Sequence, residues 1–248
     1  MGSGFYAAFT GLLAGTQALE LAANNLANVS TTGYKAQLEF YNSVEASLAK
    51  SSPQTLSPLN QAINNYGVLG GSTLNLQPGE LESTGNDLDL GMSGSGFFVV
   101  QRPSGLAYTR NGNFMVDADG QVLTSLGYPV MGEQGPLVIP SGQVSVSTDG
   151  TVSVSGAVVD QLQIVDFPAS TPMVPIGNSM YSAPQGVATP ATSPQIHQGT
   201  LEQSNMSPIA GTVGLIMIQR QAQLLQQALS IFHNEFNKSA AEELPHVG

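Results

Sequence analysis

Two stretches at opposite ends of the chain, 3-SGFYAAFTGLLAGTQALELAANNLAN-28 and 208-PIAGTVGLIMIQRQAQLLQQALSIFHNEFNK-238, decide the fold. In each, apolar residues recur at alternating spacings of four and three, which is heptad spacing and places them on one seam of a helix. Because the two seams can meet only if the middle of the chain returns to where it started, the pattern predicts two terminal helices paired as a coiled-coil-like stalk. The seam residues are Phe5, Phe9, Leu12, Leu19 and Leu26 in the first helix and Leu215, Ile218, Leu225, Leu229 and Phe232 in the second.

The faces of these helices outside the seams are also apolar. Glu20 is the only charged side chain before Lys35, and Arg220 is the only one from position 208 to 234. A helix that is apolar nearly all round is buried on several sides. One hairpin seam buries only one side, so we expect further copies of the chain to cover the remaining faces. The seam residues are then expected to carry assembly, and the ends to order fully only when copies pack side by side.

Composition removes several classes of function. The chain has 248 residues, a formal net charge of −11 and only 6 Lys and Arg, so it can form no basic patch for nucleic acid or an anionic membrane. Cysteine is absent, which excludes disulfides and thiolate chemistry. The glutamines and Arg220 within 215–232 argue against membrane insertion. No basic residue precedes Lys35, so we expect no cleavable secretory signal.

The middle of the chain has the pattern of an antiparallel β domain. Val144–Ser147 and Val152–Ser155 alternate about Asp149-Gly150, which predicts a β-hairpin. With the helical ends, this gives an α+β fold with a helical domain at 1–35 plus 200–248, a connector at 36–72 plus 184–199, and a central β domain at 73–183. Residues 34–49 return to helical spacing, and 50–71 are interpreted as an extended connector or a loop. The other expected strands are 73–76, 97–102, 106–110, 114–116, 122–124, 138–139 and 162–167.

No constellation of residues indicates an enzyme, a metal site or a cofactor. His197, His233 and His246 have no partner at a catalytic or metal-ligand spacing, so we expect them to be solvated or packed. Residues 117–120 begin like a calcium loop but lack its later ligands, which favours a hairpin turn. The Gly-rich run 91–96 fits neither a nucleophile elbow nor a nucleotide loop, which leaves close backbone packing. An acidic cluster is interpreted as a solvated face; it consists of Glu80, Glu82, Asp87 and Asp89.

One long motif closely resembles the N-terminal signature of the bacterial flagellar rod and hook proteins. The resemblance continues through 84–90, 94–100, 108–114, 117–120, 127–130, 198–206 and 219–220, and so covers nearly the whole chain. The motif residues are Ala23, Asn24, Asn25, Leu26, Ala27, Asn28, Val29, Ser30, Thr31, Thr32, Gly33, Tyr34 and Lys35.

The resemblance implies a structural subunit of the flagellar axial filament. It implies export through the flagellar type III apparatus and polymerisation into a helical tube, with the terminal helices on the inner wall and the β domain outside. The partners would be further copies of the chain, neighbouring rod proteins and the export apparatus, with no small-molecule substrate. In this picture Asn24, Asn25 and Asn28 satisfy backbone groups where the first helix ends.

Within the family, the length excludes the short rod proteins and the longer hook protein. The segment after Lys35 lacks a longer polar insertion associated with the distal rod, and the ending at 240–245 is similar to proximal-rod chains. We therefore expect a proximal-rod subunit that crosses the periplasm in the basal body. A distal-rod subunit is the alternative, and a secreted β-rich binding module is the alternative from another class.

Overall fold

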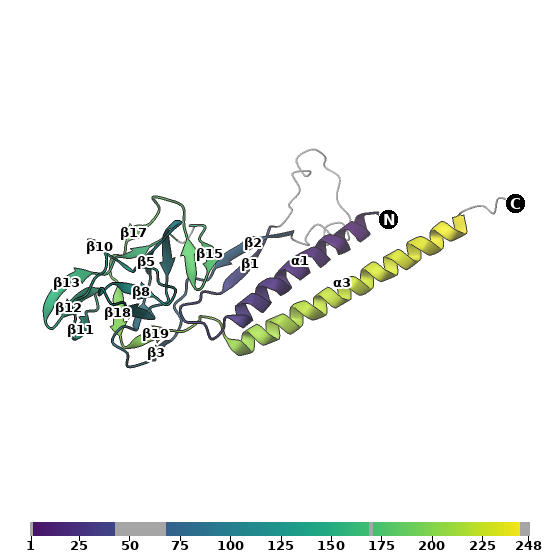
Figure 1. The fold of residues 1–248 in the computed structure, drawn as a ribbon. Coiled ribbons are helices and arrows are strands. Elements are labelled where there is room, and N and C mark those ends of the chain that lie inside the picture. Colours follow the sequence, from purple (N-terminus) through teal and green to yellow (C-terminus); the bar gives the residue numbers. More distant parts are fainter. Residues whose placement is uncertain (1, 43–67, 169–170, 244–248) are drawn as a thin grey trace. The chain divides into compact units, whose positions relative to one another are not determined.

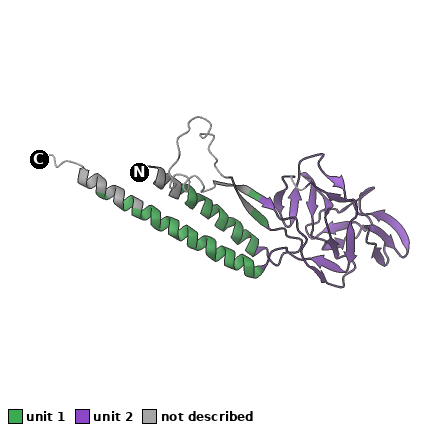
Figure 2. Ribbon diagram, turned by 180° about the vertical axis from the view of Figure 1, so that it is seen from behind, with its two compact units in different colours: residues 1–26, 37–72, 208–248 green, residues 27–36, 73–207 purple. Residues whose placement is uncertain are grey.

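The computed structural model describes residues 2–42, 68–168 and 171–243. The chain divides into two compact units, coloured separately in Figure 2. Unit 1 comprises residues 1–26, 37–72 and 208–248, and unit 2 comprises 27–36 and 73–207. Residues 27–36 and 200–207, which the sequence places beside the terminal helices, thus belong to the unit that contains most of the strands.

Unit 1 contains both terminal helices, α1 (Gly2–Ala27) and α3 (Pro208–Glu243), which run side by side (Figure 1). Both starts and the end of α1 lie within one residue of the predicted positions. The prediction ended α3 at Lys238, but Ala240, Ala241 and Glu242 are strong helix formers and extend it. A Cβ added to Gly11 would lie 3.5 Å from Leu225 Cδ1, and one added to Gly15 would lie 3.9 Å from the Cβ of Ala222. The two helices therefore contact each other and run antiparallel.

The face of α1 that packs against α3 differs from the predicted seam. Small residues occupy that face: Gly11 and Gly15 lie against α3, and Ala14 and Ala18 are buried. Phe9, a predicted seam residue, is 52% exposed. The heptad reading chose the largest apolar side chains, whereas a close approach of two helices is made by the smallest ones, against which a leucine of the partner helix can pack. The side chains of Phe5 and Phe232 lie outside the described part.

The helix predicted at 34–49 is wrong where the structure describes it. Residues Gln37–Asn42 form strand β1, which pairs with β2 (Val68–Leu74). Residues 68–71, predicted as part of an extended connector or a loop, belong to strand β2. Alternate residues of a short β strand can mimic helical spacing, so periodicity alone does not separate the two. The rest of both predicted segments, 43–67, lies outside the described residues.

Unit 2 is a mainly antiparallel β structure, as predicted. Its largest sheet has six strands in the order β15-β16-β6-β5-β14-β17. The described pairings between its strands are all antiparallel. The strands are β3 (Leu81–Ser83), β4 (Leu90–Ser93), β5 (Phe97–Arg102), β6 (Gly105–Thr109), β7 (Phe114–Val116), β8 (Val122–Thr124), β9 (Met131–Gly132), β10 (Gly135–Pro136), β11 (Val144–Val146), β12 (Thr151–Val154), β13 (Ala157–Gln161), β14 (Ile164–Asp166), β15 (Val174–Gly177), β16 (Met180–Ser182), β17 (Thr189–Pro190), β18 (Gln195–Gln198) and β19 (Thr200–Glu202).

The hairpins predicted from turn chemistry are confirmed. β11 and β12 pair in the register Val144↔Val154 about the Asp149-Gly150 turn. β7 and β8 flank the predicted turn at 117–120, where the Asp117 carboxylate accepts hydrogen bonds from the backbone N–H groups of Asp119 and Gln121. The Asp117 carboxylate therefore stabilises the turn at 117–120 by accepting its backbone N–H groups, which explains why an aspartate begins this turn.

Several strands have no alternating apolar pattern and were not predicted. β3 and β4 pair with β19 and β18, which lie more than a hundred residues later in the chain. Of these, β18 lies in the stretch 184–199 that the sequence suggests as a connector. The predicted strand at 138–139 is only a single bridge, between Gln121 and Val138.

The apolar side chains of unit 2 form two clusters. The larger contains Met92, Phe98, Val100, Val130 and Ile196, all at most 1% exposed. The smaller is aromatic and contains Phe97, Tyr108, Phe167 and Tyr181, whose rings meet edge to face. Successive residues of β5 point to opposite faces, so this strand supplies side chains to both clusters.

Candidate functional site

The family motif begins on the last turns of α1. Asn25 is buried, and its side-chain amide makes two hydrogen bonds to the backbone of Gln37. Nδ2 donates to the Gln37 carbonyl at 2.8 Å, and Oδ1 accepts from the Gln37 N–H at 2.9 Å. The backbone groups that these two bonds satisfy belong to Gln37, the first residue of β1. That these asparagines satisfy backbone groups at the helix end stays a prediction.

Gly33 lies in the part of the motif that belongs to unit 2. Its φ of +65° is in the left-handed region, and a Cβ at this position would lie 2.3 Å from the backbone nitrogen of Asn111. The Gly33 N–H donates to the Glu202 carbonyl at 2.7 Å. Both the backbone conformation and the close approach require glycine here.

Lys35, the last residue of the motif, is the centre of a buried network. Its side chain is 1% exposed, and its ammonium group lies 2.6 Å from Glu202 Oε1 and donates to the Gln77 carbonyl at 2.6 Å. Burial lowers the pKa of Lys35 below its usual value, and the nearby Glu202 carboxylate opposes that shift.

Arg110 approaches the same carboxylate from the other side. Its Nη1 lies 3.0 Å from Glu202 Oε2, and Nη2 donates to the Gly94 carbonyl at 2.7 Å. The guanidinium also lies over the ring of Phe97, 5.2 Å from the centroid. Arg110 is 1% exposed.

Glu202, on β19, joins the two cations. Its side chain is fully buried, and Oε1 also accepts the N–H of Gly79 at 2.8 Å. Two cations and one anion leave one positive charge in excess, which the carbonyl groups of Gln77 and Gly94 help to stabilise. We call Lys35, Arg110 and Glu202 the buried charge trio.

The trio was not predicted as a site, although all its members lie in segments quoted for the resemblance. The composition contained a signal for this site. The chain has only 6 Lys and Arg, and two of them, Lys35 and Arg110, lie in stretches that are otherwise nearly uncharged. Their meeting could not be derived, because Lys35 and Glu202 are 167 residues apart. The interpretation of the acidic cluster as a solvated face is wrong for Asp89. This residue is buried, and its carboxylate accepts a hydrogen bond from the Asn113 side chain at 2.8 Å.

Tyr181 connects the trio to the aromatic cluster. Its hydroxyl accepts the Lys35 N–H at 2.8 Å, and burial raises the pKa of this tyrosine well above its usual value. The folded chain therefore keeps the Tyr181 proton above pH 10, where the unfolded chain loses it. The resulting stabilisation is complete below pH 10 and is lost as pH rises further.

We expect Tyr181→Phe to flatten this alkaline loss of stability. Above pH 10.5, where Lys35 no longer contributes because the unfolded chain has also lost its proton, the free energy of unfolding of the native chain should fall by up to about 1.4 kcal/mol per pH unit from this tyrosine. The variant should lose about 1 kcal/mol at neutral pH and show the smaller slope. Urea denaturation at pH 10.5–12 measures it, and an unchanged slope would assign the effect to another group.

Other candidate sites offer little chemistry. Ser93 Oγ lies 2.9 Å from His197 Nε2, but His197 is exposed and no carboxylate among the described residues lies within salt-bridge distance of this histidine. No cluster in the described ranges could hold a metal ion. Neither described helix is long and apolar enough to cross a membrane.

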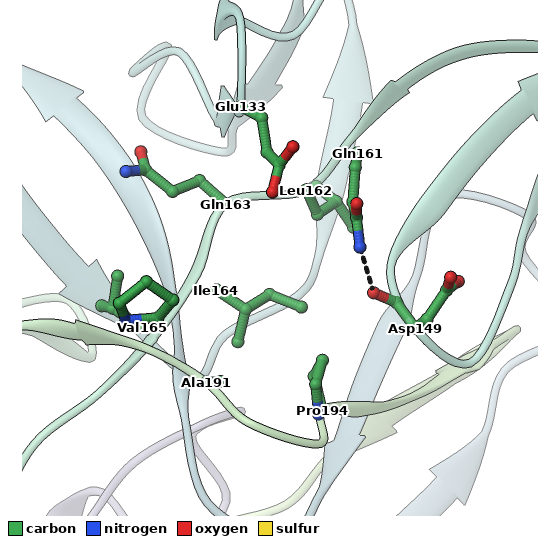
Figure 3. A pocket seen from close by; sticks show the side chains of 10 residues that line it. Glu133, Asp149, Gln161, Leu162, Gln163, Ile164, Val165, Ala191 and Pro194 are labelled. Carbon is green, nitrogen blue, oxygen red and sulfur yellow. Dashed lines mark hydrogen bonds between the residues drawn. The ribbon is translucent and has the colours of Figure 1, made fainter.

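Figure 3 shows a hollow of about 360 Å³ beside β14. Its lining includes Ile164, Glu133 and Asp149. The Asp149 carboxylate is already occupied, because it accepts from the N–H and hydroxyl of Thr151, and these hydrogen bonds lower its pKa. The Gln161 side chain donates to the Asp149 carbonyl at 3.0 Å. The hollow therefore holds no pair of free titratable groups.

Comparison with known proteins places these features in one family. A family profile described as "Flagella basal body rod protein" matches residues 5–35, and one described as "Flagellar hook protein FlgE/F/G D1 domain" matches residues 91–154. The chain is 32% identical to the flagellar basal-body rod protein FlgF of Caulobacter vibrioides, with 92% of each chain covered. It is 32% identical to FlgG of Buchnera aphidicola subsp. Acyrthosiphon pisum, with 89% of this chain and 92% of the relative covered.

A third relative, FlgF of Salmonella typhimurium, is 30% identical over 93% of this chain and 95% of its own length. The two profiles cover the helix that ends at the motif and the β structure that holds Arg110. With relatives of this identity aligned over nearly the whole length, the chain belongs to the flagellar basal-body rod proteins.

Proposed function

We propose that the chain is a proximal-rod subunit of the FlgF type that polymerises with copies of itself and with neighbouring rod proteins. The rod-protein family is a structural one, and the chain is a structural component of the flagellar basal body. In the proposal, the chain leaves the cell through the flagellar type III apparatus and becomes part of the shaft that transmits torque from motor to hook.

The observation that carries the proposal is the apolar surface that α1 and α3 leave uncovered. Met217, Leu224 and Ile231 recur at intervals of seven along α3 and are 65%, 65% and 61% exposed. Such a repeat is typical of a helix face that packs along another helix. Exposed stripes of this kind mark protein interfaces, and side-by-side copies would bury them. The other exposed large apolar residues of these helices are Phe9, Leu13, Ile209, Val213 and Ile216.

Two sets of helical residues thus have different proposed roles. Ala222 and Leu225 of α3 pack against α1 within one subunit. The exposed apolar residues of α1 and α3 named above, which include the predicted seam residue Phe9, are proposed to carry contacts between subunits. Many weak contacts of this kind, repeated along a helical array, sum to a stiff assembly.

The choice of the proximal over the distal rod is supported by the sequence. The stretch after Lys35 has no long polar insertion, and the C-terminal sequence at 240–245 is similar to proximal-rod chains. The distal-rod alternative is supported by relatives named FlgG at the same identity as those named FlgF. The binding-module alternative is set aside, because the chain belongs to a family of structural proteins.

We expect Leu224→Glu to weaken self-association of the full chain by at least about tenfold, because a carboxylate at the centre of the α3 stripe would have to be desolvated in the interface. Sedimentation velocity over a range of protein concentrations measures this. Raising the salt concentration should promote association of the native chain, since its net charge of −11 opposes the approach of copies.

Leu106→Glu is the matched control, because Leu106 is also exposed, at 48%, but lies on the turn side of a β strand in unit 2. It should leave self-association unchanged. Equal loss in both variants would show that added charge, and not the α3 stripe, controls association.

A further inference from the structure

We propose that residues 27–36, 73–79 and 200–207 form one cooperative unit, the closing unit, whose docking requires Glu202. This unit opens at a lower free energy than the β core of unit 2. It closes only when the C-terminal part of the chain is present. These three stretches, the closing segments, are those through which the chain enters and leaves unit 2. The first follows α1 and the last precedes α3.

Hydrogen bonds join the three closing segments to one another, and β19 in the third segment also pairs with β3. Asn205 is the hub: its Oδ1 accepts the Ala36 N–H at 2.8 Å, and its Nδ2 donates to the Asn75 carbonyl at 2.8 Å and the Gln77 carbonyl at 2.9 Å. The Asn75 N–H donates a hydrogen bond to the Ala36 carbonyl at 2.7 Å. Each segment therefore holds the other two, so the loss of any one removes partners from both.

The buried charge trio makes this arrangement conditional on Glu202. Glu202 contacts Lys35 in the first segment and the Gly79 N–H in the second, and it neutralises Arg110 from the β domain. Without the carboxylate, two cations would be buried together with no anion, which is strongly unfavourable. The first segment can therefore dock at low free-energy cost only when the third is in place.

The apolar core depends little on these segments. The larger cluster is built from residues between Leu90 and Ile196, and the aromatic cluster receives only partly buried side chains, Leu74 and Leu76, from the closing segments. The closing segments bury Tyr34, Ala36 and Leu201 outside the two clusters. Segments that contribute little to the main apolar core open at lower free energy than the core itself. Opening would release both ends of unit 2 together.

Closure also depends on distant parts of the chain. Lys35 and Glu202 are separated by 167 residues, whereas hairpins such as β5–β6 and β7–β8 join neighbouring strands. A chain that lacks its C-terminal part can form the hairpins but cannot neutralise Lys35 and Arg110. In such a chain, the motif residues 27–35 do not dock on the β core until residues 200–207 are present and folded against it.

Hydrogen exchange with mass spectrometry on the full-length chain tests the proposal. In Glu202→Gln, peptides covering all three closing segments should exchange faster by one common factor, on the order of 100- to 1,000-fold. Peptides covering 97–102 and 122–130 should keep their native rates. Lys35→Met removes one cation and leaves Arg110 paired with Glu202, so it should accelerate the same peptides much less.

Glu133→Gln is the matched control, because Glu133 is an exposed carboxylate between β9 and β10, outside the closing segments, and should leave exchange unchanged. Acceleration confined to 200–207 would overturn the common closing unit. Equal acceleration of the core peptides would place the trio in global unfolding. If the Glu202→Gln chain does not fold, hydrogen exchange of the native chain still tests the proposal. Unequal opening free energies in the three closing segments would refute their cooperativity.

Discussion

Gly33→Ala is expected to destabilise unit 2 by about 3–5 kcal/mol, with loss of docking of residues 27–36. Two costs combine. Alanine at a φ of +65° is strained, and its Cβ would lie 2.3 Å from Asn111 N and 2.5 Å from the carbonyl carbon of Arg110. Both atoms belong to the backbone and cannot move without displacing the Arg110 side chain from Glu202. Chemical denaturation followed by far-UV circular dichroism measures the free energy of unfolding.

Gly85→Ala separates the two costs. Gly85 has a similar φ of +72°, but an added Cβ would meet nothing within 4 Å. This control should lose only the conformational part, about 1–2 kcal/mol. If the two variants lose the same free energy, the close approach of Gly33 to Asn111 contributes nothing to stability.

Leu225→Asp is expected to abolish incorporation into the rod while leaving unit 2 folded. Leu225 packs against Gly11, so a carboxylate there removes roughly 2–4 kcal/mol of apolar contact between α1 and α3 and exposes both inner faces. Quantitative mass spectrometry of basal bodies from the bacterium that encodes the chain measures incorporation, which should fall at least about tenfold.

Gln226→Asp introduces the same charge on an adjacent, exposed position of α3 and should be incorporated normally. Limited proteolysis of the Leu225→Asp chain should leave a resistant fragment that corresponds to unit 2. A Leu225→Asp chain whose residues 73–207 are digested as quickly as its helices would contradict the separation of the two units.

Local patterns in the sequence predict the elements whose partners lie nearby in the chain. The heptad spacing predicts both terminal helices, and the alternation about Asp149-Gly150 predicts the β11–β12 hairpin in its observed place. β1 was mistaken for helix, because a six-residue strand carries too few residues to distinguish the two periods. Strands β18 and β19 each contain a single apolar residue, Ile196 and Leu201, so neither shows an alternating pattern. Their partners β4 and β3 lie in the other half of the chain, so no local turn signal marks the pairing.

The amino-acid order alone therefore decides the class of fold, the two helical ends and the family, because heptads, turn residues and the motif are read within a few residues of one another. Tertiary structure alone decides that Lys35, Arg110 and Glu202 share one buried site and that small residues of α1 face α3. The physical reason is that burial and charge pairing depend on which distant segments the closed chain brings together. Local spacing contains no information about that distance in space.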